Sequence, residues 1–443
     1  MPEILLLAAI ALPLLAALPG LDRRAAIAAA LLSTACAAAA LIAAPPAAAL
    51  AAFGSPGAPL LRADALSSVP LLLYACLALG VLVASPRRDP HRDFLLLLSG
   101  TLTVYAAGNV WVLLAGWTLS AVPLLVRRGP AESPAPVRRL LPAAAMAASV
   151  ILLAAGLALL GPAPLAAFVL IVLAALVRKG LFPFHTWVVA AFQNGPLLTA
   201  GLVANAHLGA FVIARVAIPL LPDYSRDALT LVSNLALISG LYAAFAGLGE
   251  RRPRRSLALL MISQSSFILS GLESRNAEGI AGALTSWMVV AAATMGLLIV
   301  FRALEKRCAG LGDTEFAGLA ATAPRLAVFF AICGLALVGL PGTLGFAAED
   351  LLFHGALAGH PLLGVALPLA TALNAINVYR LFSSLFLGQR ATRVPVFPDA
   401  LRGERLVLTA LVLFLILAGV VPSAVVSSRS GPAEAIASLL ALN

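Results

Sequence analysis

Charged side chains are scarce in this chain of 443 residues, of which 11% are charged and 62% are hydrophobic. Soluble domains carry about a quarter charged residues, so the shortage excludes a soluble globular enzyme. A transmembrane helix needs about 20 apolar residues, and the chain has room for about 14 such helices with short connections. The sequence therefore predicts an all-α polytopic membrane protein that forms a single membrane domain over residues 1–443.

Cysteine is also rare. The four cysteines, Cys36, Cys76, Cys308 and Cys333, lie far apart in the sequence, and no pair has the CxxC spacing of a metal or redox site. The chain has no nucleotide-binding loop and no pair of haem ligands on facing helices. We therefore expect no cofactor, no metal and no catalytic residue in this chain. Whether it serves in an enzyme stays open, because it can still be a subunit of a proton-translocating oxidoreductase.

Lysine is almost absent, with two lysines among 29 basic residues. The net charge of +10 comes from arginine clusters between apolar runs. Such clusters are topology signals, so we expect no nucleic-acid partner. They follow odd-numbered spans, and the positive-inside rule then places both termini on the non-cytoplasmic side of the inner (plasma) membrane. The first residues lack the basic start of a signal peptide, so we expect a retained first span.

The expected spans are apolar runs bounded by glycine, proline or charge. They lie near residues 3–19, 25–43, 67–85, 93–107, 108–126, 140–160, 165–190, 196–220, 228–248, 256–272, 279–303, 325–354, 362–388 and 405–427.

The seventh span contains basic residues around a proline. Lys179, Arg178 and His185 flank Pro183, which disrupts a helix. Ionisable groups at bilayer depth are functional candidates, and broken helices often mark ion sites. A buried lysine can release its proton, whereas arginine cannot. His207 in the next span adds a group that titrates near neutral pH. The alternatives are that the two basic residues end the helix at the cytoplasmic surface and that His207 is a hydrogen-bonded core residue.

The twelfth span contains a second break. Pro341, Gly342 and Gly345 interrupt it, and Glu349 and Asp350 follow as the carboxylates expected inside a span. The alternative is a helix that ends at Gly345 and leaves both acids in a loop.

The two breaks lie five spans apart, so the two segments cross the membrane in opposite directions, as inverted repeats require. We expect a first repeat of spans 4–8 over 93–220 and a second repeat of spans 9–13 over 228–388. Residues 1–92 form the three preceding spans, and 405–427 form span 14.

Further polar side chains lie in other spans. Ser263 and Gln264 in span 10, with Asn374 and Asn377 in span 13, hold water chains for proton transfer or make interhelical hydrogen bonds. Arg215 in span 8 is expected to extend toward the outer surface.

The motif PFHTW at 183–187, followed by Gly195-Pro196, resembles the antiporter-like proton-conducting subunits of respiratory complex I. Relatives of that family include Mrp-type cation/proton antiporters, membrane hydrogenase subunits and a membrane subunit for inorganic-carbon uptake. Further similar segments are LLRADALSSVPLLL, RRSLALLMISQSSF, GLPGTLGF and NAINVYRLF. The resemblance implies buried lysine, histidine and glutamate residues that move protons, with Pro196 and the other prolines at helix breaks.

The sequence departs from the family pattern at several of these positions. Arg178 occupies the usual lysine position of span 7, and Lys179 follows it, about 100° around the helix. Thr118 replaces the glutamate of span 5, and Met295 lies near the lysine position of span 11. We expect no long lateral helix after span 14. The proton-path candidates are Lys179, Arg178, His185, His207, Glu349, Asp350, Ser263 and Gln264.

The leading functional hypothesis is a proton-translocating, antiporter-like subunit of a multisubunit membrane complex, such as a complex I-like NADH:quinone oxidoreductase. The alternatives are an Mrp-type Na⁺/H⁺ antiporter subunit, an inorganic-carbon uptake subunit and a transport-inactive scaffold. The expected partners are other membrane subunits, the lipid bilayer and a cytoplasmic protein at the arginine-rich loops.

Overall fold

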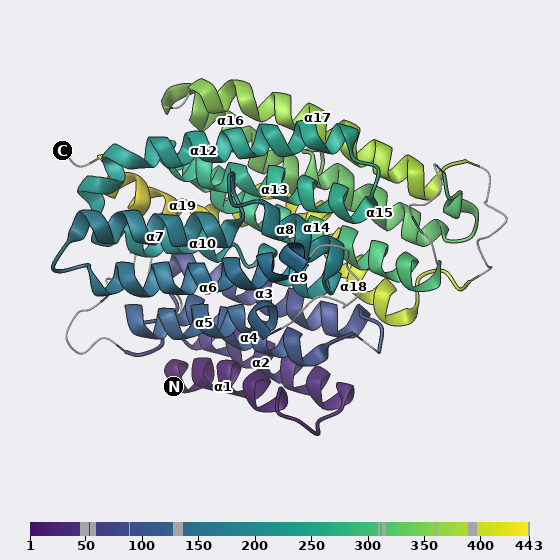
Figure 1. Cartoon of the computed structure of the whole chain (residues 1–443), viewed down its shortest axis with the longest axis horizontal. Coiled ribbons are helices and arrows are strands. Elements are labelled where there is room, and N and C mark those ends of the chain that lie inside the picture. The colour runs from purple at the N-terminus through teal and green to yellow at the C-terminus, as the bar shows by residue number, and fades with distance from the viewer. Residues whose placement is uncertain are drawn as a thin grey trace.

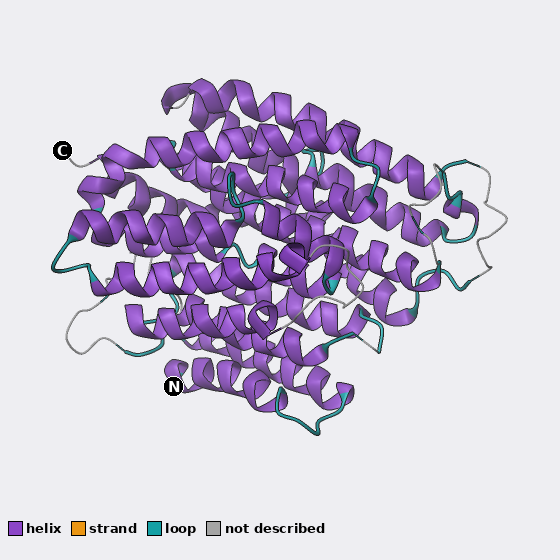
Figure 2. Ribbon diagram, in the orientation of Figure 1, coloured by secondary structure: helices purple, strands orange, loops and turns teal. Residues whose placement is uncertain are grey.

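The computed structural model describes residues 1–44, 53, 59–87, 89–126, 136–308, 311, 316–359, 361–388 and 397–441. Helices are the regular elements throughout these ranges (Figure 2). Nine helices in the described part of the chain are long and apolar enough to cross a membrane. The all-α polytopic prediction is confirmed, and the count of fourteen spans stays a prediction. The arginine-rich loops 127–135 and 389–396 lie outside the described residues.

The first half of the chain contains short helices after residue 179. Its helices are α1 (Pro2–Ala16), α2 (Arg23–Ala43), α3 (Ala65–Ala84), α4 (His91–Ala106), α5 (Val110–Val126), α6 (Pro136–Ala158), α7 (Pro164–Lys179), α8 (Thr186–Asn194), α9 (Leu197–Asn205), α10 (Leu208–Val212), the π-helix η1 (Ile213–Ala217) and α11 (Ile218–Leu220).

The second half contains longer helices and one interrupted pair. Its helices are α12 (Pro222–Gly249), α13 (Pro253–Leu272), α14 (Ala277–Arg307), the 3-10 turn η2 (Leu319–Ala321), α15 (Pro324–Leu337), α16 (Leu344–Gly359), α17 (Pro361–Phe386), α18 (Arg402–Val420) and α19 (Pro422–Ala441).

Polar residues start several of these apolar helices. Asp22 accepts a backbone hydrogen bond at the start of α2, and Asp64 forms a capping box with Ser67 at the start of α3. Asn109 accepts a hydrogen bond from the backbone of Val112 at 2.9 Å and so opens α5 directly after the turn that follows α4. Spans 4 and 5 are therefore separate helices, as the sequence predicts.

The helices run alongside one another as one bundle, with α14 in the middle (Figure 1). The apolar part of α14 is completely buried, and it contacts α9, α13, α16 and α19. Close helix contacts depend on small residues. A Cβ on Gly282 of α14 would lie 2.6 Å from the backbone nitrogen of Leu352 on α16. The helix after the second break, α16, therefore packs closely against one continuous central helix.

The last span differs from its prediction. The sequence places it at 405–427, but α18 ends at Val420 and α19 continues from Pro422 to Ala441. Pro422 lacks the N–H group that would extend α18, and it starts the new helix instead. The serines and Arg429 read as a loop in the sequence, yet Arg429 is 2% exposed because α19 packs on α3 and α14. The predicted end at 427 was therefore wrong.

The chain starts and ends at the same end of the bundle, where α1 begins and α19 finishes (Figure 1). An even number of membrane crossings places both ends of a chain on the same side of the membrane.

Candidate functional site

The first break brings a lysine and a histidine together inside the protein. Helix α7 ends at Lys179, and Gly180 adopts a left-handed conformation with φ of 70°. Pro183 lies in the following loop, and Trp187 donates a hydrogen bond of 2.7 Å to the backbone oxygen of Val177. The same carbonyl accepts a hydrogen bond of 3.1 Å from the Gly180 N–H, so the indole adds a second donor at the end of the interrupted helix.

A third break, between α9 and α10, holds the histidine. His207 has a φ of 46°, and its Nδ1 lies 2.6 Å from Nζ of Lys179. Both side chains are buried, at 1% exposed for His207 and 7% for Lys179. No proline or glycine lies between Asn205 and Leu208, so the sequence did not predict this break. Pro196, predicted as a break residue, lies in the connection between α8 and α9 and precedes α9.

The contact between Lys179 and His207 can hold a limited number of protons. A neutral imidazole accepts a hydrogen bond from the ammonium group, or a neutral amine accepts one from Nδ1–H. The doubly protonated pair would place two donors against each other. Nε2 of His207 is buried and has no hydrogen-bond partner among the described residues. One proton therefore lies between Nζ of Lys179 and Nδ1 of His207, while Nε2 of His207 remains open to a further hydrogen bond.

Arg178 occupies a different place from its neighbour. Its guanidinium donates to Ser120 Oγ at 2.6 Å and contacts Met146 Sδ at 2.9 Å. It also lies over the Trp117 ring, 5.2 Å from the ring centre. An arginine held this way supplies a fixed charge, because it does not release its proton. Of the two basic residues, Lys179 is the one that faces His207.

His185 lies in an aromatic environment. Its ring stacks 5.9 Å from Phe182 and meets Tyr242 edge-on at 5.0 Å. The residue is partly buried, and its Nδ1 has no hydrogen-bond partner within the described ranges. The structure gives no direct contact between His185 and the Lys179–His207 pair among the residues that it describes.

The second break positions a carboxylate. Pro341 and Gly342 lie in the loop between α15 and α16, and Gly345 falls in the first turn of α16. Glu349 follows one turn later, and its Oε1 accepts a hydrogen bond of 3.2 Å from Thr371 Oγ1 of α17. Gly339 has a φ of 69°, and a Cβ there would lie 2.4 Å from Glu349 Oε2. The glycine therefore leaves the space that the carboxylate occupies.

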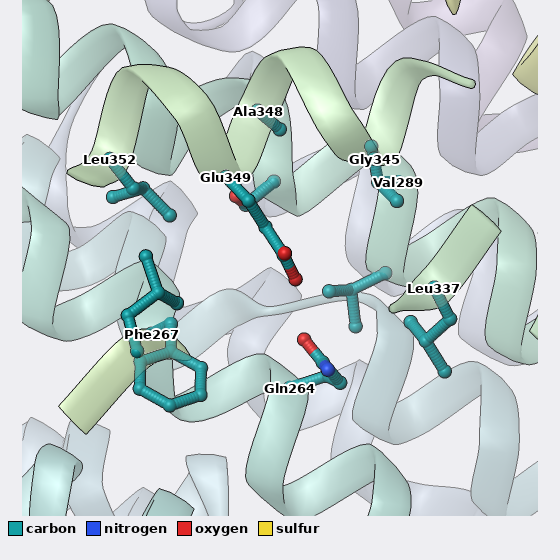
Figure 3. A pocket seen from close by; sticks show the side chains of 11 residues that line it. Gln264, Phe267, Val289, Leu337, Gly345, Ala348, Glu349 and Leu352 are labelled. Atoms are coloured by element: carbon teal, nitrogen blue, oxygen red, sulfur yellow. The ribbon is translucent and has the colours of Figure 1, made fainter. Parts of the chain in front are cut away.

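Glu349 points into a small cavity toward Gln264 of α13 (Figure 3). The cavity volume is about 10 Å³, roughly the space of one water molecule. Ser286 of α14 also lines it, and the buried Nε2 of Gln264 has no hydrogen-bond partner in the described part of the chain. Three polar side chains from three helices thus surround a space for a single water.

Asp350 is not part of this cavity. Its side chain is 51% exposed, and it pairs with His354 at 3.4 Å, which is 53% exposed. Consecutive helix residues differ by about 100° in direction, so Asp350 points away from the interior that Glu349 faces. Of the two predicted acids, Glu349 alone lines the cavity.

Ser263 makes interhelical hydrogen bonds. It donates to the backbone oxygen of Gly240 at 2.8 Å and accepts from Asn374 Nδ2 at 2.8 Å. Asn377 donates to the Ala244 oxygen at 2.9 Å. These contacts join α12, α13 and α17, so the structure favours the packing role for Ser263 and separates it from Gln264.

Helix α14 adds polar residues that the sequence pattern did not predict as part of the site. Thr294 donates to Asn205 Oδ1 at 2.7 Å, and the Trp287 ring meets the His207 ring edge-on at 5.6 Å. Ser286, next to Trp287, faces the Glu349 cavity. The one sequence feature that could have indicated them is a hydroxyl-bearing residue, Ser286 or Thr294, within a long apolar run. Helix α14 therefore contacts both the Lys179–His207 pair and the Glu349 cavity.

Arg215 was expected to extend to the surface, and that prediction was wrong. Its side chain is 3% exposed and forms a 2.5 Å ion pair with Asp64. The guanidinium also lies over Phe53, 4.6 Å from the ring centre. Asp64 lies 151 positions earlier in the chain, so a local reading of span 8 could not reveal it.

Known proteins share both the sequence pattern and this fold. The family model described as "NADH:quinone oxidoreductase/Mrp antiporter, TM" matches residues 150–374. NADH-quinone oxidoreductase subunit M of Rickettsia typhi is 28% identical over 256 residues, which are 57% of this chain and 51% of the relative. NADH-quinone oxidoreductase subunit 13 of Thermus thermophilus is 32% identical over 270 residues, 60% of this chain and 57% of the relative. The chain spans about half the length of the curated relatives that it matches.

Solved structures match over a larger part of the chain. A chain of respiratory complex I from Thermus thermophilus with bound NADH superposes with a TM-score of 0.85 at 25% identity, covering 100% of both chains. A chain of the Mrp complex from Dietzia sp. gives a TM-score of 0.82 at 19% identity, covering 99% of this chain and 96% of that one. The second match concerns the fold alone.

Proposed function

Because the chain belongs to the NADH:quinone oxidoreductase/Mrp antiporter membrane family, we propose that it moves protons as a subunit of a multisubunit membrane complex. The observation that carries the proposal is the buried hydrogen bond between Lys179 and His207 at two facing helix breaks. Two titratable nitrogens at 2.6 Å can exchange a proton without moving the backbone.

The proton path that we propose has two stations. The first is the Lys179–His207 pair, and the second is Glu349 with its one-water cavity. Helix α14 lies between them, with Thr294 near the first station and Ser286 at the second. The hydroxyl groups and the open Nε2 of His207 are positions where water can bridge. Arg178 contributes a fixed positive charge next to Trp117, and Lys179 is the residue that titrates.

The energy source lies in partner subunits, since the proposed path contains no redox group. We place both termini on the non-cytoplasmic side and the arginine-rich end of the bundle in the cytoplasm, as the charge bias predicts. A cytoplasmic partner would meet the chain at that end.

The test is proton flux into proteoliposomes that hold the native complex. Lys179→Arg keeps the charge and removes the capacity to release a proton, so flux should fall at least as far as in Lys179→Ala. Glu349→Gln should also reduce flux, and Asp350→Asn is its matched control because Asp350 lies outside the cavity. Wild-type flux in both Lys179→Arg and Glu349→Gln would reject proton transfer and favour a transport-inactive scaffold.

A second candidate is Na⁺/H⁺ antiport at the same cavity. Glu349, Gln264 and Ser286 offer the oxygen atoms that hard cations prefer, although a single carboxylate gives the site little charge. If Na⁺ is carried, the flux should depend on Na⁺ concentration and disappear when K⁺ replaces it.

A further inference from the structure

A pocket with a volume of about 470 Å³ opens at the arginine-rich end of the bundle, between α3, α14 and α18. Its ionisable lining consists of five basic side chains and one acid: Arg23, Arg87, Lys306, Arg307, Arg402 and Glu404.

Two of the basic residues are occupied by the protein itself. Arg23 donates to the backbone oxygens of Leu82 at 2.7 Å and Ser85 at 2.9 Å, and so closes the end of α3. Arg307 donates to both carboxylate oxygens of Glu404 at 2.7 Å. These contacts hold the walls of the pocket and engage Glu404, the one acid among the described residues that line it.

The other three basic residues have no such partners. Arg87, Lys306 and Arg402 are exposed and make no hydrogen bond or ion pair with any side chain that the structure describes. Lys306 is one of the two lysines of the chain. Three positive charges with no counter-ion among the described residues therefore converge on one pocket, which favours a ligand with a phosphate group.

An apolar groove continues from this pocket through Val83, which lines both. Its volume is about 900 Å³, and it runs along α3 beside α18 and α19. The lining extends on α3 from Ala65 to Val83. At 1.5 Å per residue this is about 27 Å, close to the hydrocarbon thickness of both leaflets of a bilayer, so an acyl chain from one leaflet fits within the half next to the pocket. Leu77 and Leu406 are typical of its walls, so the groove fits acyl chains.

We propose that the pocket and the groove together bind one anionic phospholipid, with its phosphate at Arg87, Lys306 and Arg402 and an acyl chain along α3 and α18. Charge complementarity selects the headgroup, and the adjoining apolar groove selects a lipid over free phosphate. A helix from a partner subunit would fill the groove and leave the three charges unpaired.

The experiment uses the full chain in nanodiscs that contain phosphatidylglycerol or phosphatidylcholine carrying a diazirine in one acyl chain. Light-induced labelling of the peptides 65–84 and 402–420 should be strong with phosphatidylglycerol and weak with phosphatidylcholine. The triple variant Arg87→Gln/Lys306→Gln/Arg402→Gln should bind phosphatidylglycerol about a hundredfold more weakly, since each basic residue contributes about fivefold. The matched control Arg24→Gln/Arg251→Gln/Arg405→Gln removes three exposed arginines that do not line the pocket.

Two further variants test the groove without touching the charges. Ala410→Trp fills it and should abolish labelling, whereas Leu413→Trp changes an exposed residue of α18 outside the groove and should leave labelling unchanged. Equal labelling by both lipids, or equal loss in both triple variants, overturns the proposal. Labelling in nanodiscs that disappears in native membranes also overturns it, because a partner helix then occupies the groove.

Discussion

Gly339 gives a sharp test of how Glu349 is positioned, because a nearby glycine provides a matched control. Gly339 and Gly342 both lie in the break before α16 with positive φ, 69° and 87°. A Cβ on Gly339 would meet Glu349 Oε2 at 2.4 Å, whereas a Cβ on Gly342 would have no atom within 4 Å. Alanine at either position costs about 1–2 kcal/mol for the left-handed conformation.

Gly339→Ala must additionally move the carboxylate. Ordinary contact needs about 3.5 Å, so the Glu349 carboxylate has to shift by about 1 Å from the position that it holds at the cavity with Gln264. Loss of a positioned acid–base group reduces proton transfer by about 100-fold. Gly339→Ala should therefore abolish most flux, and Gly342→Ala should keep it.

The assay measures proton flux and thermal stability of both variants in the same proteoliposomes. The two proteins should lose similar backbone stability and differ in flux. Equal flux in the two variants would refute the assigned position of Glu349, and so would wild-type flux in Gly339→Ala.

Three other substitutions have expected outcomes. Ser120→Ala removes a hydrogen bond to the buried Arg178 and should destabilise the protein by about 1.5–3 kcal/mol, measured by thermal or denaturant unfolding in detergent. Asparagine tolerates the left-handed backbone at position 207 but has no imidazole. In His207→Asn, proton flux should therefore fall while the protein stays folded, as size-exclusion chromatography would record. Asp64→Asn should lower the free energy of unfolding by about 3–5 kcal/mol, because Arg215 stays buried and loses the negative charge of the Asp64 carboxylate. Adding Arg215→Gln should recover part of the loss. A double variant less stable than the single one would contradict this pairing.

Much of the helical architecture is predictable from apolar runs. The breaks after Lys179 and before Glu349 were foreseen because proline and glycine mark them. The break at His207 was not, because neither proline nor glycine lies at the break itself, and the left-handed residue is a histidine. The same limit applies to α19, whose Arg429 and serines look like a loop until α3 and α14 cover them.

The site was predictable as a set of residues but not as an arrangement. Sequence alone left Arg178 and Lys179 as equal candidates, since each can face the interior of a helix bundle. The distinction depends on Ser120, 58 positions away, which holds Arg178, and on His207, 28 positions away, which meets Lys179. Contacts across such distances in sequence have no local pattern. Glu349 and Asp350 pose the same problem, and the packing of α16 separates them.

The complete burial of α14 has a consequence for how the protein responds to its bilayer. A helix shielded from lipid along its apolar length does not respond directly to membrane thickness. Helix α18, in contrast, has only 22% of its apolar stretch buried and lies largely at the periphery of the bundle. Hydrophobic mismatch should therefore tilt or shift outer helices first. The polar groups near the centre are insulated from that deformation, so changing lipid chain length should alter stability well before it alters transport.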